Sequence, residues 1–205
     1  MFIRIAPGDS VRVLAVVPRR QFSGHAVVDG WGLAPGSFAT WDLRWPATEE
    51  ERIRSFRQHL IRSLHRYRPG VLVLGIPRFA DHLSRALRET AMQLAAAYGV
   101  PAVERSVAQA RSLLLGCQRG SHDDALADKV TGGFFPELLG HLTERQSIQR
   151  KYRRHAFEAA ILALHELVER APLSAAAVAK DAAFEMGTFN SALTASARQH
   201  FPDNL

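Results

Sequence analysis

The spacing of hydrophobic and polar residues predicts three strands near the start of the chain. The β-branched run Ser10–Val17 predicts a strand, and Ser23–Trp31 predicts its hairpin partner across a turn that carries two arginines. A third strand is expected within Ser37–Trp45, mixed with loop. The chain is therefore predicted to open with a β-meander.

Helical periodicity and continuous apolar runs then alternate. Thr48, followed by three glutamates, predicts a helix start, because its hydroxyl can cap the helix and the acids oppose the helix dipole. The unbroken apolar run Val71–Ile76 is typical of a strand buried on both faces. The remaining predicted elements are helices over about 48–67 and 81–98, a strand within 100–107, a short helix from 107, a helix beginning at Ser121, and a last helix over about 154–169.

This order of elements predicts an α/β fold with a mixed sheet flanked by helices, because the long crossover helices imply parallel strand pairs. Hydrophobic residues make up 47% of the chain, enough for a substantial core. Pro172-Leu173 is read as a domain boundary, which gives one domain over 1–170 and a small helical piece over 173–205.

The net positive charge of the chain favours a negatively charged partner. The chain carries 26 basic and 20 acidic residues, a net charge of +6 with a pI near 10.2, which favours nucleic acid. Only three basic residues are lysines, and arginine suits forked contacts to phosphate, although a GC-rich coding sequence explains the arginines equally well. A single cysteine, the absence of a signal-peptide pattern and the absence of a membrane-length apolar run lead us to expect a cytoplasmic protein without membrane contact.

Three segments in series resemble a known nuclease class. The turn segment "VPRRQFSGHAVV", Val17–Val28, is followed by the strand Val71–Ile76 and, much later, by "HAFEAAILALHE", His155–Glu166. Their order resembles the RNase H-like fold, particularly the RuvC-like Holliday-junction resolvases, over about residues 10–170. The resemblance implies DNA as the partner and pairing of two copies into a homodimer.

The same resemblance implies four acidic metal-ligand positions, which here become Val17, Gly75, His155 and Glu158. Two-metal hydrolysis of a phosphodiester needs several carboxylates to hold the ions. Glu158 is the single acid retained, and an ion-paired or solvated helix glutamate is the simpler interpretation of it. We therefore predict a pseudo-nuclease with a degenerate site, no catalytic residue, no bound metal and no cofactor.

A rearranged metal site is the alternative, and it would require Mg²⁺ or Mn²⁺. Its ligands would come from Asp29, Glu158 and the stretch His122–Asp128, which holds Asp123, Asp124 and Asp128. Acidic residues directly after Ser121 would also stabilise the N-terminus of a helix through its dipole. Helix capping is therefore the better interpretation of that stretch.

Two basic segments are the candidate nucleic-acid contacts. Arg19 and Arg20 lie in the hairpin turn beside the degenerate site, and "RQSIQRKYRRH" leads into the last predicted helix. A tyrosine within the second segment could stack on a base. A solvated surface loop is the competing interpretation. The candidates in this segment are Arg145, Arg150, Lys151, Tyr152, Arg153 and Arg154.

The C-terminal stretch Val178–Leu193 resembles the helix-turn-helix of bacterial repressors. Small residues at Ala179 and Ala183 would let two helices approach, with Phe189 between them. Such a motif would present Thr188, Asn190 and Ser191 to DNA. Two basic residues against three acids from Pro172 onward leave a packing or dimerisation pair of helices equally open.

Together these observations predict metal-independent binding of structured or double-stranded DNA without cleavage. The alternatives are an active metal-dependent endonuclease with a rearranged site and a protein-interaction scaffold.

Overall fold

A computed structural model of the chain describes residues 11–30, 32–45, 48–76, 81–114, 133–135, 138 and 147–170, with side chains of the last range described from Arg154 onward. The chain divides into two units, Met1–Leu167 and Val168–Leu205. The predicted helix behind Ser121 and the predicted helix-turn-helix lie outside the described residues.

The described strands form one mixed six-stranded sheet. Its central path runs β3 (Gly32–Leu33), β2 (Phe22–Asp29), β1 (Val13–Val17), β5 (Val71–Ile76) and β6 (Ala102–Ser106), and β4 (Ala39–Asp42) also pairs with β2. β1 is antiparallel to β2 and parallel to β5, which is in turn parallel to β6. The predicted fold class is confirmed.

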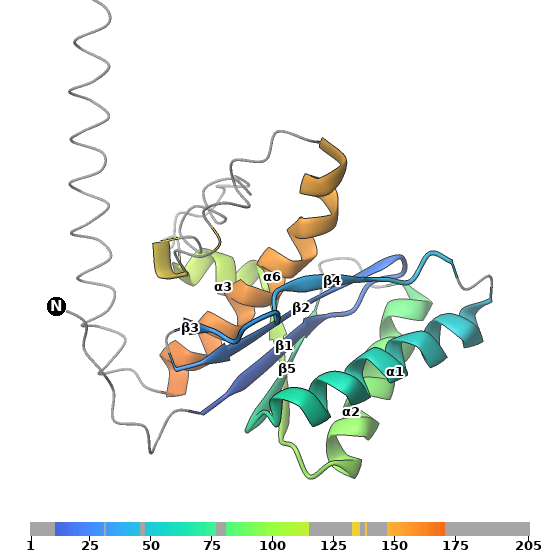
Figure 1. Cartoon of the computed structure of the whole chain (residues 1–205), viewed down its shortest axis with the longest axis horizontal. Helices are drawn as coiled ribbons and strands as arrows, with labels where there is room; N and C mark the ends of the chain where they lie inside the picture. Colours follow the sequence, from blue (N-terminus) through green and yellow to red (C-terminus); the bar gives the residue numbers. More distant parts are fainter. Residues whose placement is uncertain are drawn as a thin grey trace, which may run out of the picture. The chain divides into compact units, whose positions relative to one another are not determined.

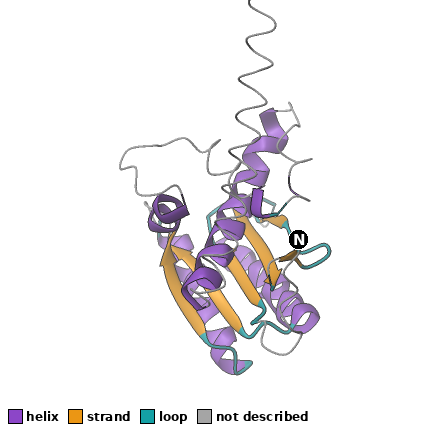
Figure 2. Cartoon of the chain, turned by 90° about the vertical axis from the view of Figure 1, so that its left-hand side faces the viewer, coloured by secondary structure: helices purple, strands orange, loops and turns teal. Residues whose placement is uncertain are grey.

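Helices cover both faces of this sheet. Helices α1 (Glu49–Tyr67) and α2 (His82–Ala97) pack on one face, and α3 (Val107–Leu114) and α6 (Ser147–Arg170) on the other (Figures 1 and 2). The sheet therefore separates two apolar cores. Within the described residues, no helix is both long and apolar enough to cross a membrane.

The alternation of side chains in the central strands builds these two cores. In β1, Val13, Ala15 and Val17 face α6, whereas Leu14 and Val16 face α1 and α2. All five are fully buried. Because β1 lies between two strands and under helices on both faces, it needs apolar residues at every position, which is the continuous pattern of its sequence.

The predicted ends of α1 and α2 are confirmed. Thr48 caps α1, and its hydroxyl accepts a hydrogen bond from the Glu51 N–H while the Glu51 carboxylate accepts one from the Thr48 N–H. Asp81 caps α2 in the same manner through the Ser84 N–H, at 2.7 Å. Strand β5 has the predicted bounds.

Two details of the prediction are wrong. The short strand β3 is not expected from its two residues, and α6 begins at Ser147 rather than near Arg154. Residues 147–153 contain no Gly or Pro and several good helix formers, so intrinsic propensity extends the helix beyond its apolar periodicity. Arg150, Lys151, Tyr152 and Arg153 thus lie on helical backbone, and a surface loop is excluded for them.

Candidate nucleic-acid interface

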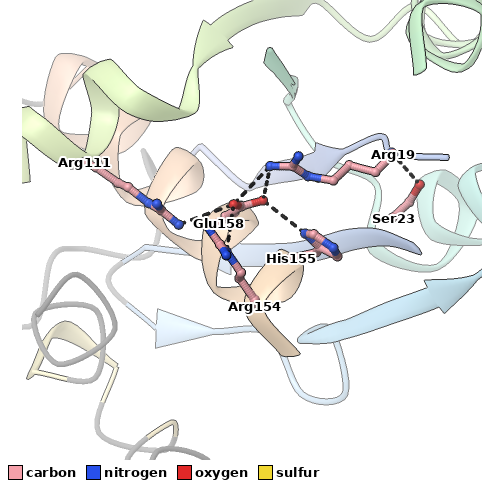
Figure 3. A network of polar contacts seen from close by, with 6 residues as sticks. All are labelled: Arg19, Ser23, Arg111, Arg154, His155 and Glu158. Carbon is pink, nitrogen blue, oxygen red and sulfur yellow. Dashed lines mark hydrogen bonds and ion pairs between the residues drawn. The ribbon is translucent and has the colours of Figure 1, made fainter. Parts of the chain in front are cut away.

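The turn between β1 and β2 places Arg19 over α6. The pairing of β1 with β2 ends with Val17 opposite Gly24, and residues 18–21 connect the two strands. The buried Ser23 hydroxyl accepts a hydrogen bond from the Arg19 N–H at 3.3 Å. This local bond fixes the turn and directs the Arg19 side chain toward the helix (Figure 3).

Gly24 allows α6 to approach the sheet at this point. A Cβ atom added to Gly24 would lie 1.8 Å from the carbonyl oxygen of His155 and 2.5 Å from the Ala156 nitrogen. Backbone therefore packs directly on backbone, and only glycine fits. The contact brings the first residues of the buried part of α6 beside the turn.

Glu158 lies at the centre of a polar cluster on this face. Its carboxylate is 2% exposed. One Arg19 nitrogen, Nη2, donates to both carboxylate oxygens, at 2.9 Å and 3.1 Å. Arg111 of α3 donates to Oε1 at 3.3 Å, and Nε of Arg154 lies 3.7 Å from the same oxygen. His155 Nδ1 lies 3.2 Å from Oε2, and Figure 3 shows all four side chains converging on the carboxylate.

These contacts keep Glu158 ionised. Burial by itself raises the pKa of the carboxyl, but the hydrogen bond from His155 and the charges of Arg19, His155 and Arg111 outweigh burial, and the pKa falls from 4.5 to about 2. The interpretation of Glu158 as an ion-paired glutamate is thus supported over a solvated one. We call Arg19, Arg111 and Arg154 the arginine cluster.

The guanidinium groups of this cluster reach solvent to different degrees. The side chain of Arg154 is 51% exposed, that of Arg19 31% and that of Arg111 20%. Three cations anchored on one buried carboxylate form a preorganised positive surface, which is the arrangement that phosphate oxygens bind.

Val17 and Gly75, the positions of two implied metal ligands, lie against each other in the core. A Cβ atom on Gly75 would lie 2.9 Å from the Val17 side chain and 2.8 Å from that of Leu162. Val17, Leu162 and Val107 fill this space with apolar groups. Valine and glycine offer no side-chain ligand, and Glu158 is saturated by cations, so these residues do not fit a two-metal centre.

The ligands considered for a rearranged site do not assemble in the described part of the chain. Asp29 lies at the opposite end of β2 from Gly24, where it forms an ion pair with Arg12. No group of three or more His, Cys, Asp or Glu residues that could hold a metal occurs among the described residues. His122, Asp123, Asp124 and Asp128 lie outside them.

Arg20, the second arginine of the turn, is exposed, and its charge influences Asp81 on the face of the sheet that α1 and α2 cover. Its charge contributes to the lowered pKa of Asp81, at the start of α2: burial raises this pKa, and the Ser84 hydrogen bonds, Arg20 and His82 lower it. The two neighbouring arginines of the turn thus act on opposite faces of the sheet. The structure does not bring Arg20 to Glu158.

Sequence reasoning missed two arginines on the α6 face. Arg111 joins Glu158 from α3, and Arg105 of β6 pairs with the buried Glu166 of α6 at 3.0 Å. Neither residue stands in a basic run. The available signal was the two-turn spacing of Glu158 and Glu166 on an otherwise apolar stretch of α6, since buried acids require cationic partners.

The remaining predicted contacts are not placed at the site. Arg145, Thr188, Asn190 and Ser191 lie outside the described residues, and the side chains of Arg150, Lys151, Tyr152 and Arg153 are likewise not described.

Comparisons with known proteins identify the fold. The chain matches the structure of RuvC from Thermus thermophilus with a TM-score of 0.59 at 20% identity, covering 78% of this chain and 95% of that one. The structure of the same protein in complex with a Holliday junction substrate matches with a TM-score of 0.58 at 19% identity and the same coverage. The fold is RuvC-like. No family model and no curated protein sequence matches the chain.

The RuvC-like fold accounts for the order of the three segments that first suggested it. The hairpin turn, the end of β5 and the beginning of the buried part of α6 meet on one face, as the contacts of Gly24 and Gly75 show. The four implied ligand positions therefore lie close together in space, with Val17 against Gly75 and His155 against Glu158, and Glu158 is the one acid among them.

Proposed function

We propose that this chain binds DNA through the arginine cluster, without a metal ion and without cleaving the strand. The observation that carries the proposal is the environment of Glu158: the single retained acid is buried under cations, and its implied partner positions are occupied by Val17 and Gly75. In this arrangement fixed guanidinium groups supply the positive charge that bound divalent ions would otherwise bring to a phosphate.

Three further observations support the proposal. The net charge of +6 favours a polyanion. The RuvC-like fold occurs in a protein whose structure was determined with a Holliday junction substrate. The half-exposed Arg154 lies at the edge of the cluster, where a phosphate can reach it. We also propose that two copies of the chain form a homodimer. Each copy would make a second contact with DNA through Thr188, Asn190 and Ser191.

The decisive experiment is binding of the full chain to a four-way junction, a plain duplex and single strands, in EDTA and then with Mg²⁺ or Mn²⁺. We expect binding in EDTA and no cleaved product with either metal. Affinity should fall steeply with salt, by about one power of salt concentration per phosphate contact. Nicking that requires metal and is lost in Glu158→Ala would favour the endonuclease alternative instead.

Arg154→Gln tests whether the arginine cluster binds DNA while leaving the contacts of Arg19 and Arg111 with Glu158 in place. Because Arg154 is half exposed and makes the longest contact to Glu158, at 3.7 Å, its loss should cost less than about 1 kcal/mol of folding free energy. DNA affinity should nevertheless fall at all sequences, and the salt slope should decrease by about one.

Arg57→Gln is the matched control, since Arg57 is exposed on α1, on the other face of the sheet. Equal losses of affinity in both variants would mean a diffuse charge effect and would contradict the assignment of the site. Absence of DNA binding by the unsubstituted chain would favour the protein-interaction scaffold.

A further inference from the structure

Trp45 is the most exposed large hydrophobic side chain in the described part of the chain. It is 82% exposed, whereas the next, Leu113, is 51% exposed. It follows the end of β4, where the buried Trp41 and Leu43 alternate with the exposed Asp42 and Arg44. A tryptophan this exposed buries little apolar area in the described fold, which leaves the face of its indole ring open to a ligand.

The neighbour of Trp45 is a fixed cation. The guanidinium carbon of Arg44 lies 4.8 Å from the centre of the Phe22 ring, and Asp42 accepts hydrogen bonds from Arg44 at 2.7 Å and 3.0 Å. Strand pairing continues past β4 through the Leu43 N–H, which donates to the Gln21 carbonyl at 2.8 Å. Arg44 is therefore held at the sheet edge beside the exposed indole.

This edge connects with the site at Glu158. The Phe22 ring stacks on the imidazole of His155 with centroids 6.4 Å apart and an interplanar angle of 22°. His155 in turn contacts Glu158, which holds Arg19. A continuous series of contacts thus runs from Arg44 to the arginine cluster, and both lie at the end of the sheet that carries the β1–β2 turn.

We propose that Trp45 is a stacking site for an unpaired nucleobase whose phosphates lie on Arg44 and the arginine cluster. The inference rests on the proposed DNA binding and specifies which DNA is preferred: strands with unpaired or unstacked bases, as at gaps and branch points. An aromatic face accepts any base, while adjacent guanidinium groups bind the backbone. In a continuous duplex the bases are stacked on each other and cannot reach Trp45.

The test compares a duplex that carries a short gap of unpaired thymidines with the same duplex fully paired, each titrated in EDTA. The chain holds three tryptophans, of which Trp41 is buried. Binding of the gapped duplex should quench tryptophan emission in Trp31→Phe as in the unsubstituted chain, and this quenching should be lost in Trp45→Phe. Trp45→Ala should lose about tenfold in affinity for the gapped duplex, with little change for the paired one. Trp45→Phe should keep most of the affinity because it retains an aromatic face.

Tyr98→Ala is the matched control, an exposed aromatic at the end of α2. It should bind both duplexes like the unsubstituted chain. Equal loss on both duplexes in Trp45→Ala, or no loss on either, overturns the stacking site while the proposed function stands. Loss of self-association in Trp45→Ala, measured by sedimentation without any change in DNA binding, overturns it in favour of a second copy of this chain. Failure of the unsubstituted chain to bind either duplex overturns the proposed function and the stacking site together.

Discussion

Gly24 is the residue on which the contact between the hairpin and α6 depends. In Gly24→Ala the new methyl group would overlap the His155 carbonyl, and backbone cannot move aside as a flexible side chain can. We expect a loss of at least about 3 kcal/mol in the free energy of unfolding. Chemical denaturation measures it.

Gly32→Ala provides the control, because nothing lies within 4 Å of a Cβ atom at that position in β3. Its unfolding free energy should stay close to that of the unsubstituted chain. If both variants were equally stable, α6 would not pack on the hairpin as described.

His25 makes the stability of the fold dependent on pH. The imidazole is buried and stacks on Trp41 with centroids 4.7 Å apart. Burial, together with the nearby His59, lowers the pKa of His25 from 6.5 to about 4, although a hydrogen bond with the Ala39 backbone partly opposes the shift. The unfolded chain therefore takes up this proton more readily than the folded chain between pH 6.5 and pH 4.

Stability should consequently fall as the pH falls through that window, by about 2 kcal/mol between about pH 7 and about pH 5. In His25→Phe most of this loss should disappear, with a smaller remainder from His59, whose pKa is also lowered by burial and by Arg62. Denaturation midpoints at the two pH values would reveal the difference. The contribution of Glu158 lies lower: it is complete above pH 4.5 and is lost as the pH falls toward 2. An unchanged pH dependence in His25→Phe would mean that another group titrates.

At the scale of elements, β1, β5 and α6 pack apolar side chains where the family resemblance implies metal ligands. Val17→Asp with Gly75→Glu would place carboxylates at two of the implied positions. Because Leu162 and Val107 already fill the space, we expect the double variant to lose more than about 3 kcal/mol of stability. It should not gain metal-dependent nicking, which a plasmid assay with Mn²⁺ would detect.

Val17→Thr separates the effect of charge from that of shape, since threonine matches valine closely in size and carries no charge. It should lose only about 1 kcal/mol. Restored cleavage in the double variant would show that the elements keep the geometry of a metal site and that only the ligands are missing.

At the scale of the whole molecule, folding is concentrated in the first unit. The side chains of both described core clusters come from residues 11–167, within the unit Met1–Leu167. We therefore expect a chain ending at Arg170 to melt within a few degrees of the full chain, as followed by circular dichroism. A large drop in melting temperature would mean that residues 171–205 complete the core.

The truncated chain also tests the C-terminal prediction. If residues 173–205 form a DNA-reading helix-turn-helix, their removal should weaken binding to every DNA while the salt dependence due to the arginine cluster persists. Unchanged affinity would favour the packing interpretation of that segment.

The sequence by itself determined the elements whose causes are local. Capping by Thr48, the start of a helix near residue 81 and the continuous apolar run of β5 depend on neighbouring residues, and they are confirmed nearly to the residue. The order of these elements also sufficed to predict the RuvC-like fold. The first turns of α6 were missed because intrinsic propensity, rather than apolar periodicity, forms them.

Only the tertiary structure decided what the site contains. Arg111 and Glu158 are 47 residues apart, and their contact depends on how closely α3 and α6 pack on one face of the sheet. The divergence of Arg19 and Arg20 to opposite faces likewise follows from the conformation of the turn, which composition does not reveal. Charge in the sequence predicts a polyanionic partner, but the direction of each side chain, set by packing across the whole fold, determines where that partner can bind.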